Sequence, residues 1–302
     1  MKSGVIVLNK PSGPTSAWCL NQIKKRFALK KIGHAGTLDP MASGVLVVLI
    51  GQATKIADYI VQGTKTYYGE LRLGLETDTY DVQGTVISRG GTSGIQDRTI
   101  IDLVSEWKDL TSQEVPPVSA AKHKGRPLYK LHRSGLEVPV KTKNVKIFRA
   151  DVIKIDIPLV CFRVVCSAGT YIRSLAHSLG KRAGCKAALS KLIREQSLPF
   201  SLQEAVDLDL LLKARQWQEM SLPLEQALAH WPRLVLDAGT SRQVLNGMPV
   251  PADQFPDQPA RPDSMALMVD AQGQTLALAR LAVKEEGKPL WTVKRVLRTN
   301  SQ

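Results

Sequence analysis

One carboxylate, Asp39, lies in a segment whose residue types would hold it in a fixed position. Residues 33–44 read Gly-His-Ala-Gly-Thr-Leu-Asp-Pro-Met-Ala-Ser-Gly and lead into an apolar run at residues 45–50. Pro40 has a fixed φ and steers Asp39 away from helical geometry, whereas the glycines allow unusual backbone conformations. An acid on such a loop beside a buried strand could do chemistry. The alternative is a polar turn in which Asp39 bonds its own backbone, and the Gly, Asp and Pro content alone favours it.

Two further segments carry residues suited to a site. Residues 65–70 read Lys-Thr-Tyr-Tyr-Gly-Glu, and residues 169–173 read Gly-Thr-Tyr-Ile-Arg. The first could simply be a strand whose tyrosines are half-buried, the usual position of a strand tyrosine. The second could be a strand-to-helix connection with Thr170 as the helix cap. That alternative accounts for the glycine and the threonine but not for Tyr171 and Arg173.

Together these motifs resemble those of the bacterial tRNA pseudouridine synthase B family. The motifs occur in that family's order, with Lys10-Pro11 first, then residues 33–44 and residues 169–173, and the resemblance extends over residues 5–230. It implies an isomerase that converts uridine 55 in the TΨC loop of tRNA to pseudouridine. Such an enzyme breaks the bond between ribose C1′ and uracil N1, turns the base and rejoins it through C5.

The resemblance assigns the chemistry to three residues. Asp39 matches the essential catalytic aspartate, and Arg173 matches the arginine that pairs with it. An arginine stays charged and can hold a carboxylate with two N–H groups, which also fixes its orientation. Tyr67 matches the tyrosine that stacks on the target uracil and is a candidate base for the proton on C5. Tyr68 points to the opposite face of the strand, so the choice between the two tyrosines rests on the resemblance alone.

Five more residues match positions that contact or support the substrate. His34 and Tyr171 correspond to residues that contact the flipped nucleotide, and Leu192 to a leucine that lines the base pocket. Lys10 and Asp81 match positions that contact RNA or support the structure. The alternatives are a neutral turn histidine for His34 and ordinary core packing for Leu192.

The reaction needs no cofactor, because it loses no atoms or electrons. The sequence contains no Walker pattern, and the glycine-rich residues 90–94 lack the spacing of a dinucleotide site. Residues 76–81 gather three acids, but their spacing differs from that of a calcium loop, and a solvated loop is favoured over a magnesium site. His123 and His132 lack companion ligands for a metal. We therefore expect neither a metal nor a cofactor.

The charge of the chain indicates a polyanionic partner. Its 302 residues include 41 Lys and Arg against 27 Asp and Glu, a net charge of +14. We expect the partner to be the TΨC stem-loop of tRNA, held by basic segments at residues 24–31, 122–126 and 141–149 on one face. Aromatic residues make up only 5%, which disfavours a long single-strand stacking platform and favours shape recognition with one base flipped.

The sequence contains no signal peptide, apolar span or paired cysteine motif. We therefore expect a cytoplasmic enzyme with reduced cysteines, no membrane association and no obligate protein partner, acting as a monomer. The main alternative is a scaffold that binds or folds tRNA without catalysis. A guide-RNA-dependent synthase is a related option, but the compact length favours a stand-alone enzyme.

The elements that must position these residues follow from the hydrophobic pattern. We expect strands at residues 5–8, 65–75, 145–157, 159–167 and 187–194, and helices at residues 16–27, capped by Ser16, and 170–183. This order predicts an α+β pseudouridine-synthase domain over residues 1–230, with a mixed, largely antiparallel sheet flanked by helices. Residues 231–302 are expected to form a small β-rich, PUA-like RNA-binding domain, with strands at residues 265–269, 276–281 and 290–296.

Overall fold

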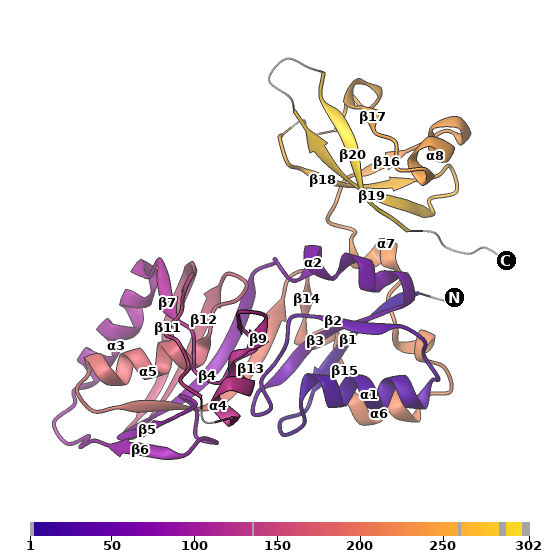
Figure 1. The fold of residues 1–302 in the computed structure, drawn as a ribbon. Helices are drawn as coiled ribbons and strands as arrows, with labels where there is room; N and C mark the ends of the chain where they lie inside the picture. The colour runs from indigo at the N-terminus through magenta and orange to yellow at the C-terminus, as the bar shows by residue number, and fades with distance from the viewer. Residues whose placement is uncertain (1–2, 135, 259–260, 284–287, 298–302) are drawn as a thin grey trace.

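The protein is α+β, with a nine-stranded sheet that spans most of the chain (Figure 1). The computed structural model describes residues 3–134, 136–258, 261–283 and 288–297. The main path of the sheet has the strand order β11 (Ile147–Asp156), β12 (Leu159–Cys166), β4 (Lys65–Leu73), β13 (Ala187–Ser197), β3 (Ser43–Ile50), β1 (Gly4–Lys10) and β15 (Val206–Asp207). Off this path, β14 (Phe200–Ser201) pairs with β13, and β2 (Ile32–Ala35) pairs with β3.

Helices and smaller sheets make up much of the rest of the described chain. The helices are α1 (Ser16–Arg26), α2 (Ala57–Ile60), α3 (Asp97–Ser105), α4 (Leu128–Arg133), α5 (Ile172–Arg182), α6 (Leu208–Lys213), α7 (Leu224–Ala227) and α8 (Ala238–Leu245). The two-stranded sheets pair β5 (Leu75–Thr77) with β6 (Val86–Arg89), β7 (Ser112–Glu114) with β10 (Thr142–Asn144), and β8 (Lys122–His123) with β9 (Arg126–Pro127). A sheet near the C-terminus has the order β16 (Arg233–Val235), β18 (Met265–Val269), β19 (Thr275–Ala282), β20 (Leu290–Val296) and β17 (Val250–Pro251).

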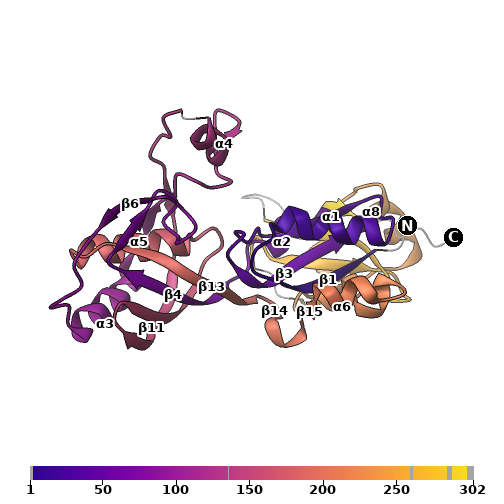
Figure 2. The ribbon, with the colours of Figure 1, turned by 90° about the horizontal axis from the view of Figure 1, so that it is seen from below.

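Strand β13 joins the two halves of the large sheet. Along its length it pairs antiparallel with β4, and at Ile193 and Arg194 it also pairs parallel with the start of β3. Most other pairings are antiparallel, as predicted. In Figure 2, α3, α5, β4 and β11 lie on one side of this junction, and α1, α6, β1 and β3 lie on the other. The loop that carries Asp39 runs directly into β3, so β13 brings it against β4.

Helix α1 begins at Ser16, as predicted, but the residue that caps it is one position earlier than expected. Thr15 is the cap, and its hydroxyl accepts a hydrogen bond from the Trp18 N–H at 3.0 Å. The predicted cap, Ser16, was wrong because its hydroxyl is buried and engaged with Leu38. It donates to the Leu38 carbonyl at 2.9 Å and accepts from the Leu38 N–H at 3.0 Å. The helix start therefore holds the residue just before Asp39.

Most of the predicted strands and helices lie within a few residues of the observed ones. The strand expected at residues 187–194 continues to Ser197, because its far end pairs with β14. The helix expected at residues 170–183 begins at Ile172, and Thr170 instead donates its hydroxyl to the Ser167 carbonyl at 2.9 Å.

The C-terminal sheet packs on both of its faces. On one face, a cluster that includes Leu234, Met268 and Trp291 packs with Val244 of α8. On the other face, Leu267 belongs to the cluster that includes residues of β1 and β3. The C-terminal unit is thus joined to the large sheet by a shared apolar core and not by a linker alone.

Candidate active site

The Asp39 loop is anchored on its C-terminal side by a buried lysine. Lys10 is fully buried at the end of β1, and its ammonium donates to the carbonyls of Pro11, Pro40 and Ala42 at 2.9, 3.3 and 2.7 Å. Burial lowers the pKa of Lys10 to about 8, although the charge of nearby Asp39 opposes this shift. These contacts fix the backbone immediately after Asp39.

The same loop is anchored on its N-terminal side by a buried arginine. Arg194 of β13 donates to the carbonyls of Gly36 at 2.9 Å and Thr37 at 3.4 Å, and its Nε donates to Val45 at 2.6 Å. Gly44 lies against the backbone of Arg194 with φ +99°, and a Cβ there would come within 2.4 Å of the Arg194 carbonyl oxygen. Only glycine fits this close approach without strain.

Asp39 lies against a second buried arginine from a distant part of the chain. The Nε of Arg173 lies 2.9 Å from Asp39 Oδ2, and its Nη1 lies 3.5 Å from Asp81 Oδ2. The Nε contact is a close ion pair without aligned hydrogen-bond geometry. The Arg173 side chain is 5% exposed and that of Asp39 is 38% exposed. The arginine is therefore a buried anchor, and the carboxylate remains open to a substrate.

Backbone carbonyls hold Arg173 in this position. Its Nη1 donates to Thr79 at 2.7 Å and its Nη2 donates to Val118 at 2.9 Å. The second carboxylate, Asp81, is itself fixed by the Thr79 hydroxyl at 2.9 Å and the Gln83 N–H at 3.0 Å. Burial raises the pKa of Asp81, and the Arg173 charge opposes the rise.

The start of α5, which carries Arg173, is clamped from β7. The side-chain amide of Gln113 accepts from the N–H of Tyr171 and donates to the carbonyl of the same residue at 3.2 Å. The Ser174 hydroxyl donates to the Glu114 carbonyl at 2.7 Å. Tyr171 is thereby held at the helix start without a side-chain cap of its own.

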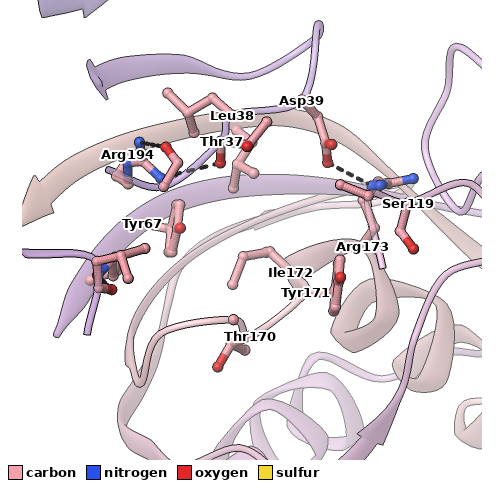
Figure 3. A pocket seen from close by; sticks show the side chains of 16 residues that line it. Thr37, Leu38, Asp39, Tyr67, Ser119, Thr170, Tyr171, Ile172, Arg173 and Arg194 are labelled. Carbon is pink, nitrogen blue, oxygen red and sulfur yellow. Dashed lines mark hydrogen bonds and ion pairs between the residues drawn. The ribbon is translucent and has the colours of Figure 1, made fainter. Parts of the chain in front are cut away.

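These elements enclose a cavity of about 260 Å³ (Figure 3). The loop and α5 contribute Asp39 and Arg173, and aromatic and apolar side chains form much of the wall. The full lining comprises residues 36–39, Val61, Lys65, Tyr67, Ser119, Ala120, residues 169–173, Leu192 and Arg194. A polar group fixed beside such walls is the usual construction of a small-ligand site.

The two tyrosines in the wall are phenols rather than phenolates at neutral pH. Burial raises the pKa of Tyr67, and the Arg194 charge partly opposes the rise. Burial also raises the pKa of Tyr171, and the nearby Arg173 charge opposes the rise. Both rings can therefore act as neutral stacking surfaces with a polar end.

The structure brings together five of the eight residues singled out from the sequence: Asp39, Tyr67, Tyr171, Arg173 and Leu192 all line the cavity. The other three lie outside its lining.

Lys10 and Asp81 are both buried. Lys10 binds the backbone of the Asp39 loop, and Asp81 contacts Arg173. Of the two roles expected for them, RNA contact or structural support, these contacts fit structural support. His34 lies on β2, where its buried Nδ1 has no hydrogen-bond partner. Burial lowers the pKa of His34, and the Arg194 charge lowers it further.

Sequence reasoning missed Arg194, Ser16 and Gln113 as parts of the site. For Arg194 a signal existed, because it lies two residues after Leu192 on the predicted strand and therefore on the same face. For Ser16 and Gln113 no local pattern existed, since their partners are 22 and 58 residues away.

Two further observations concern metals and membranes. Within the described ranges, no group of three or more His, Cys, Asp or Glu side chains is placed to hold a metal ion. Among the same residues, no helix is both long enough and apolar enough to cross a membrane.

The chain is similar in sequence to a large set of related proteins. Residues 24–172 match the model described as TruB family pseudouridylate synthase (N terminal domain). The tRNA pseudouridine synthase B of Oleidesulfovibrio alaskensis is 50% identical over 298 residues, which cover 97% of this chain and 96% of that protein. The protein of the same name from Geobacter sulfurreducens is 41% identical over 249 residues, 82% of each chain.

Solved structures share the fold at lower identity. An H/ACA ribonucleoprotein bound to a substrate RNA containing 2′-deoxyuridine includes a chain with a TM-score of 0.72 and 24% identity, matched over 99% of this chain and 86% of that one. A Cbf5–Nop10–Gar1 complex gives a TM-score of 0.71 at 24% identity, over 98% and 85% of the two chains. At this identity the likeness concerns the fold alone.

Proposed function

Because the chain belongs to the TruB family of pseudouridylate synthases, we propose that it converts uridine 55 in the TΨC loop of tRNA to pseudouridine with Asp39 as the catalytic carboxylate. The chain is an isomerase of uridine in tRNA. The position in the tRNA and the roles of single residues are the new elements of the proposal.

The reaction sets demands that the site meets. The C1′–N1 bond breaks and uracil leaves with the electron pair; the base then turns, C5 bonds to C1′, the C5 proton is lost and N1 takes up a proton. A carboxylate can assist by attacking C1′, by adding to C6 or by removing a proton from C2′. Each route needs an ionised acid held close to the nucleoside in a cavity that keeps the freed base from escaping.

The observation that carries the proposal is the pair of Asp39 and Arg173. The two atoms in contact are 2.9 Å apart, the arginine is buried, and the acid is partly exposed at a cavity of about 260 Å³. A scaffold that only bound tRNA would have no use for a carboxylate held in this way, since an acid repels phosphate. The pair thus supports catalysis over the scaffold hypothesis.

The walls of the cavity suit a nucleotide that has left its stack. An enzyme cannot reach C1′ and C5 in a folded RNA arm unless the nucleotide is extruded. Tyr67, Tyr171 and Leu192 would replace the lost stacking contacts, and base–aromatic stacking contributes about 1–3 kcal/mol per base. In the proposal, Tyr67 takes up the C5 proton after its own phenol proton has left to solvent.

The rest of the molecule suits a tRNA substrate. The net charge of +14 favours a polyanion, and the proposal includes the TΨC stem-loop as the bound element. It assigns catalysis to residues 1–230 and RNA binding to residues 231–302 as a PUA-like unit. The proposal also includes that the enzyme acts in the cytoplasm, as a monomer and without an obligate protein partner. Gel filtration with and without tRNA would check the monomeric state.

The test is modification of an unmodified tRNA transcript. The purified protein is incubated with the transcript and pseudouridine is mapped along the RNA, with a transcript carrying cytidine at position 55 as the matched control. We expect one pseudouridine at position 55 and none in the control RNA. Pseudouridine elsewhere would overturn the assigned position, and its absence at every position would overturn the assigned activity.

A further inference from the structure

Arg194 is a buried cation without an acidic partner. It is 1% exposed, yet among the residues described no carboxylate forms an ion pair with it. Its three hydrogen bonds go to neutral carbonyls of the Asp39 loop and of Val45. A buried charge is costly unless it is paired or used, so this arrangement calls for a function.

The register of the sheet places Arg194 directly opposite Tyr67. The two residues are cross-strand partners of β13 and β4, and side chains in such positions lie next to each other on one face. Both line the cavity, and Figure 3 shows Arg194 beside the loop with Tyr67 next to it. The guanidinium thus lies between the backbone that carries Asp39 and the ring expected to stack on uracil.

We propose that Arg194 is a positioning residue with two roles: it sets the backbone on both sides of Asp39, and its uncompensated charge stabilises the Tyr67 phenolate. The phenol proton leaves to solvent, and the phenolate then accepts the C5 proton. The second role rests on the proposed function, in which Tyr67 takes that proton. The first role follows from the contacts to Gly36 and Thr37 before Asp39 and to Val45 after it.

The electrostatics around Tyr67 support the second role. Burial raises the pKa of Tyr67, and of the charged or titratable groups that act on it, Cys166 of β12 and Asp39 of the loop raise it further, whereas Arg194 lowers it. Lys65, on the same strand as Tyr67, is held by the carbonyls of Val61 and Gly63. Arg194 is therefore the group in the wall that makes proton loss from Tyr67 easier.

The effect of Arg194 extends to other groups at the site. Its charge also lowers the pKa of Lys10, of His34 and of Lys65, in each case together with burial. This pattern is that of a positive charge that no acid neutralises.

The test compares Arg194→Met, which removes the charge, with Arg194→Lys, which keeps it but loses the planar fork. Fluorotyrosine is incorporated into each protein, and fluorine NMR follows the titration of residue 67. The Tyr67→Phe variant assigns its signal among the six tyrosines. Loss of the C5 hydrogen from tRNA is measured in a single turnover on the same preparations.

We expect Arg194→Met to slow the single turnover by about 100-fold or more, the size of losing one preorganised electrostatic group, and to move the Tyr67 titration to higher pH. Arg194→Lys should restore the titration but not the full rate, because a single ammonium cannot replace the three separate guanidinium nitrogens that reach Val45, Thr37 and Gly36. The matched control is Lys10→Met, which removes the anchor on the other side of Asp39. It should slow turnover and leave the Tyr67 titration in place.

A folded Arg194→Met protein with an unmoved Tyr67 titration would overturn the charge role, and an unchanged rate would overturn both roles. If Arg194→Met does not fold, Arg194→Lys decides: a shifted titration or a wild-type rate contradicts the proposal. Wild-type protein that makes no pseudouridine would instead refute the proposed function, so the two failures are distinguishable.

Discussion

At the scale of single residues, the site depends on buried cations that hold backbone carbonyls. Lys10 and Arg194 each bind carbonyls around Asp39, and Arg173 binds two carbonyls besides its carboxylates. Carbonyl dipoles stabilise the charges of Lys10 and Arg194 without neutralising them, whereas the charge of Arg173 is also paired with Asp39 and Asp81. Asp39 is thus partly exposed at the cavity, while the cations that support it are buried.

Lys10→Met is expected to flatten the dependence of stability on alkaline pH. The pKa of Lys10 is about 8 in the folded protein and 10.5 as its ordinary value. Between these two pH values the unfolded chain binds more protons at Lys10 than the folded protein does, so stability rises with pH. The contribution of Lys10 to the unfolding free energy is therefore complete above pH 10.5 and is lost as the pH falls through about 8. The whole span is on the order of 3 kcal/mol.

Urea unfolding at a series of pH values measures this slope. Lys24→Met, at an exposed lysine of α1, is the control and should keep the wild-type slope. If the unfolding free energy depended on pH equally in Lys10→Met and in wild type, burial would not lower the pKa of Lys10.

Residue types pointed to the candidate catalytic residues more readily than to the residues that support them. Asp39, Tyr67 and Arg173 belong to motifs with a recognisable spacing, and the structure gathers all three at one cavity. Gln113 and Ser16 escaped prediction because their role depends on contacts with backbone groups far along the chain. A side chain that bonds a distant main chain leaves no periodic signal in its own segment.

At the scale of elements, β13 and the start of α1 fix the loop. The sequence predicted both elements near their observed positions, because apolar spacing determines a strand or helix locally. It did not predict that β13 would pair with β3 as well as β4, because register across a sheet depends on the whole set of strands. We infer that this double pairing holds the Asp39 loop in place, and two comparisons test the inference.

Ser16→Ala is expected to lower both stability and turnover. The change leaves the buried N–H and carbonyl of Leu38 without their partner, at a cost of about 1–3 kcal/mol, and loosens the residue before Asp39. Thr15→Ala at the neighbouring position removes only the helix cap, at a cost of about 1 kcal/mol. Denaturant unfolding and single-turnover rates should show that Thr15→Ala keeps the wild-type rate; equal rate losses in the two variants would argue against the Ser16 contact.

Gly44→Ala is expected to disrupt the junction between β3 and β13. Its φ of +99° strains any side chain, and the new Cβ would lie 2.4 Å from the Arg194 carbonyl oxygen. Gly13→Ala is the matched control, since Gly13 has φ +108° but no atom within 4 Å of its Cβ position. The control should lose about 1–3 kcal/mol from backbone strain alone, and Gly44→Ala should lose clearly more. Equal losses in thermal unfolding would show that the junction tolerates a methyl group.

At the scale of the whole molecule, the chain carries a net charge of +14 and its C-terminal sheet is docked on the large sheet. The C-terminal unit contributes Leu267 to the same apolar cluster as strands β1 and β3, which fixes it against the large sheet. Composition predicted the polyanionic partner, but whether the three basic segments share one face stays a prediction.

Binding of tRNA is expected to weaken steeply with salt. With a net charge of +14, most of the affinity should come from phosphate contacts and counterion release. We expect the dissociation constant to rise about 10-fold or more between low and physiological salt, with the same slope for wild type and Asp39→Asn. Filter binding over a salt series measures it. An affinity independent of salt would mean that the basic surface does not bind the RNA.

The most direct test of the account is the single-turnover loss of the C5 hydrogen from tRNA by Asp39→Asn. The amide keeps the shape of the carboxylate, so the protein should fold and bind tRNA within about threefold of wild type, while the rate falls by about 10³-fold or more. A rate within about tenfold of wild type would contradict the assignment of the chemistry to the carboxylate beside Arg173.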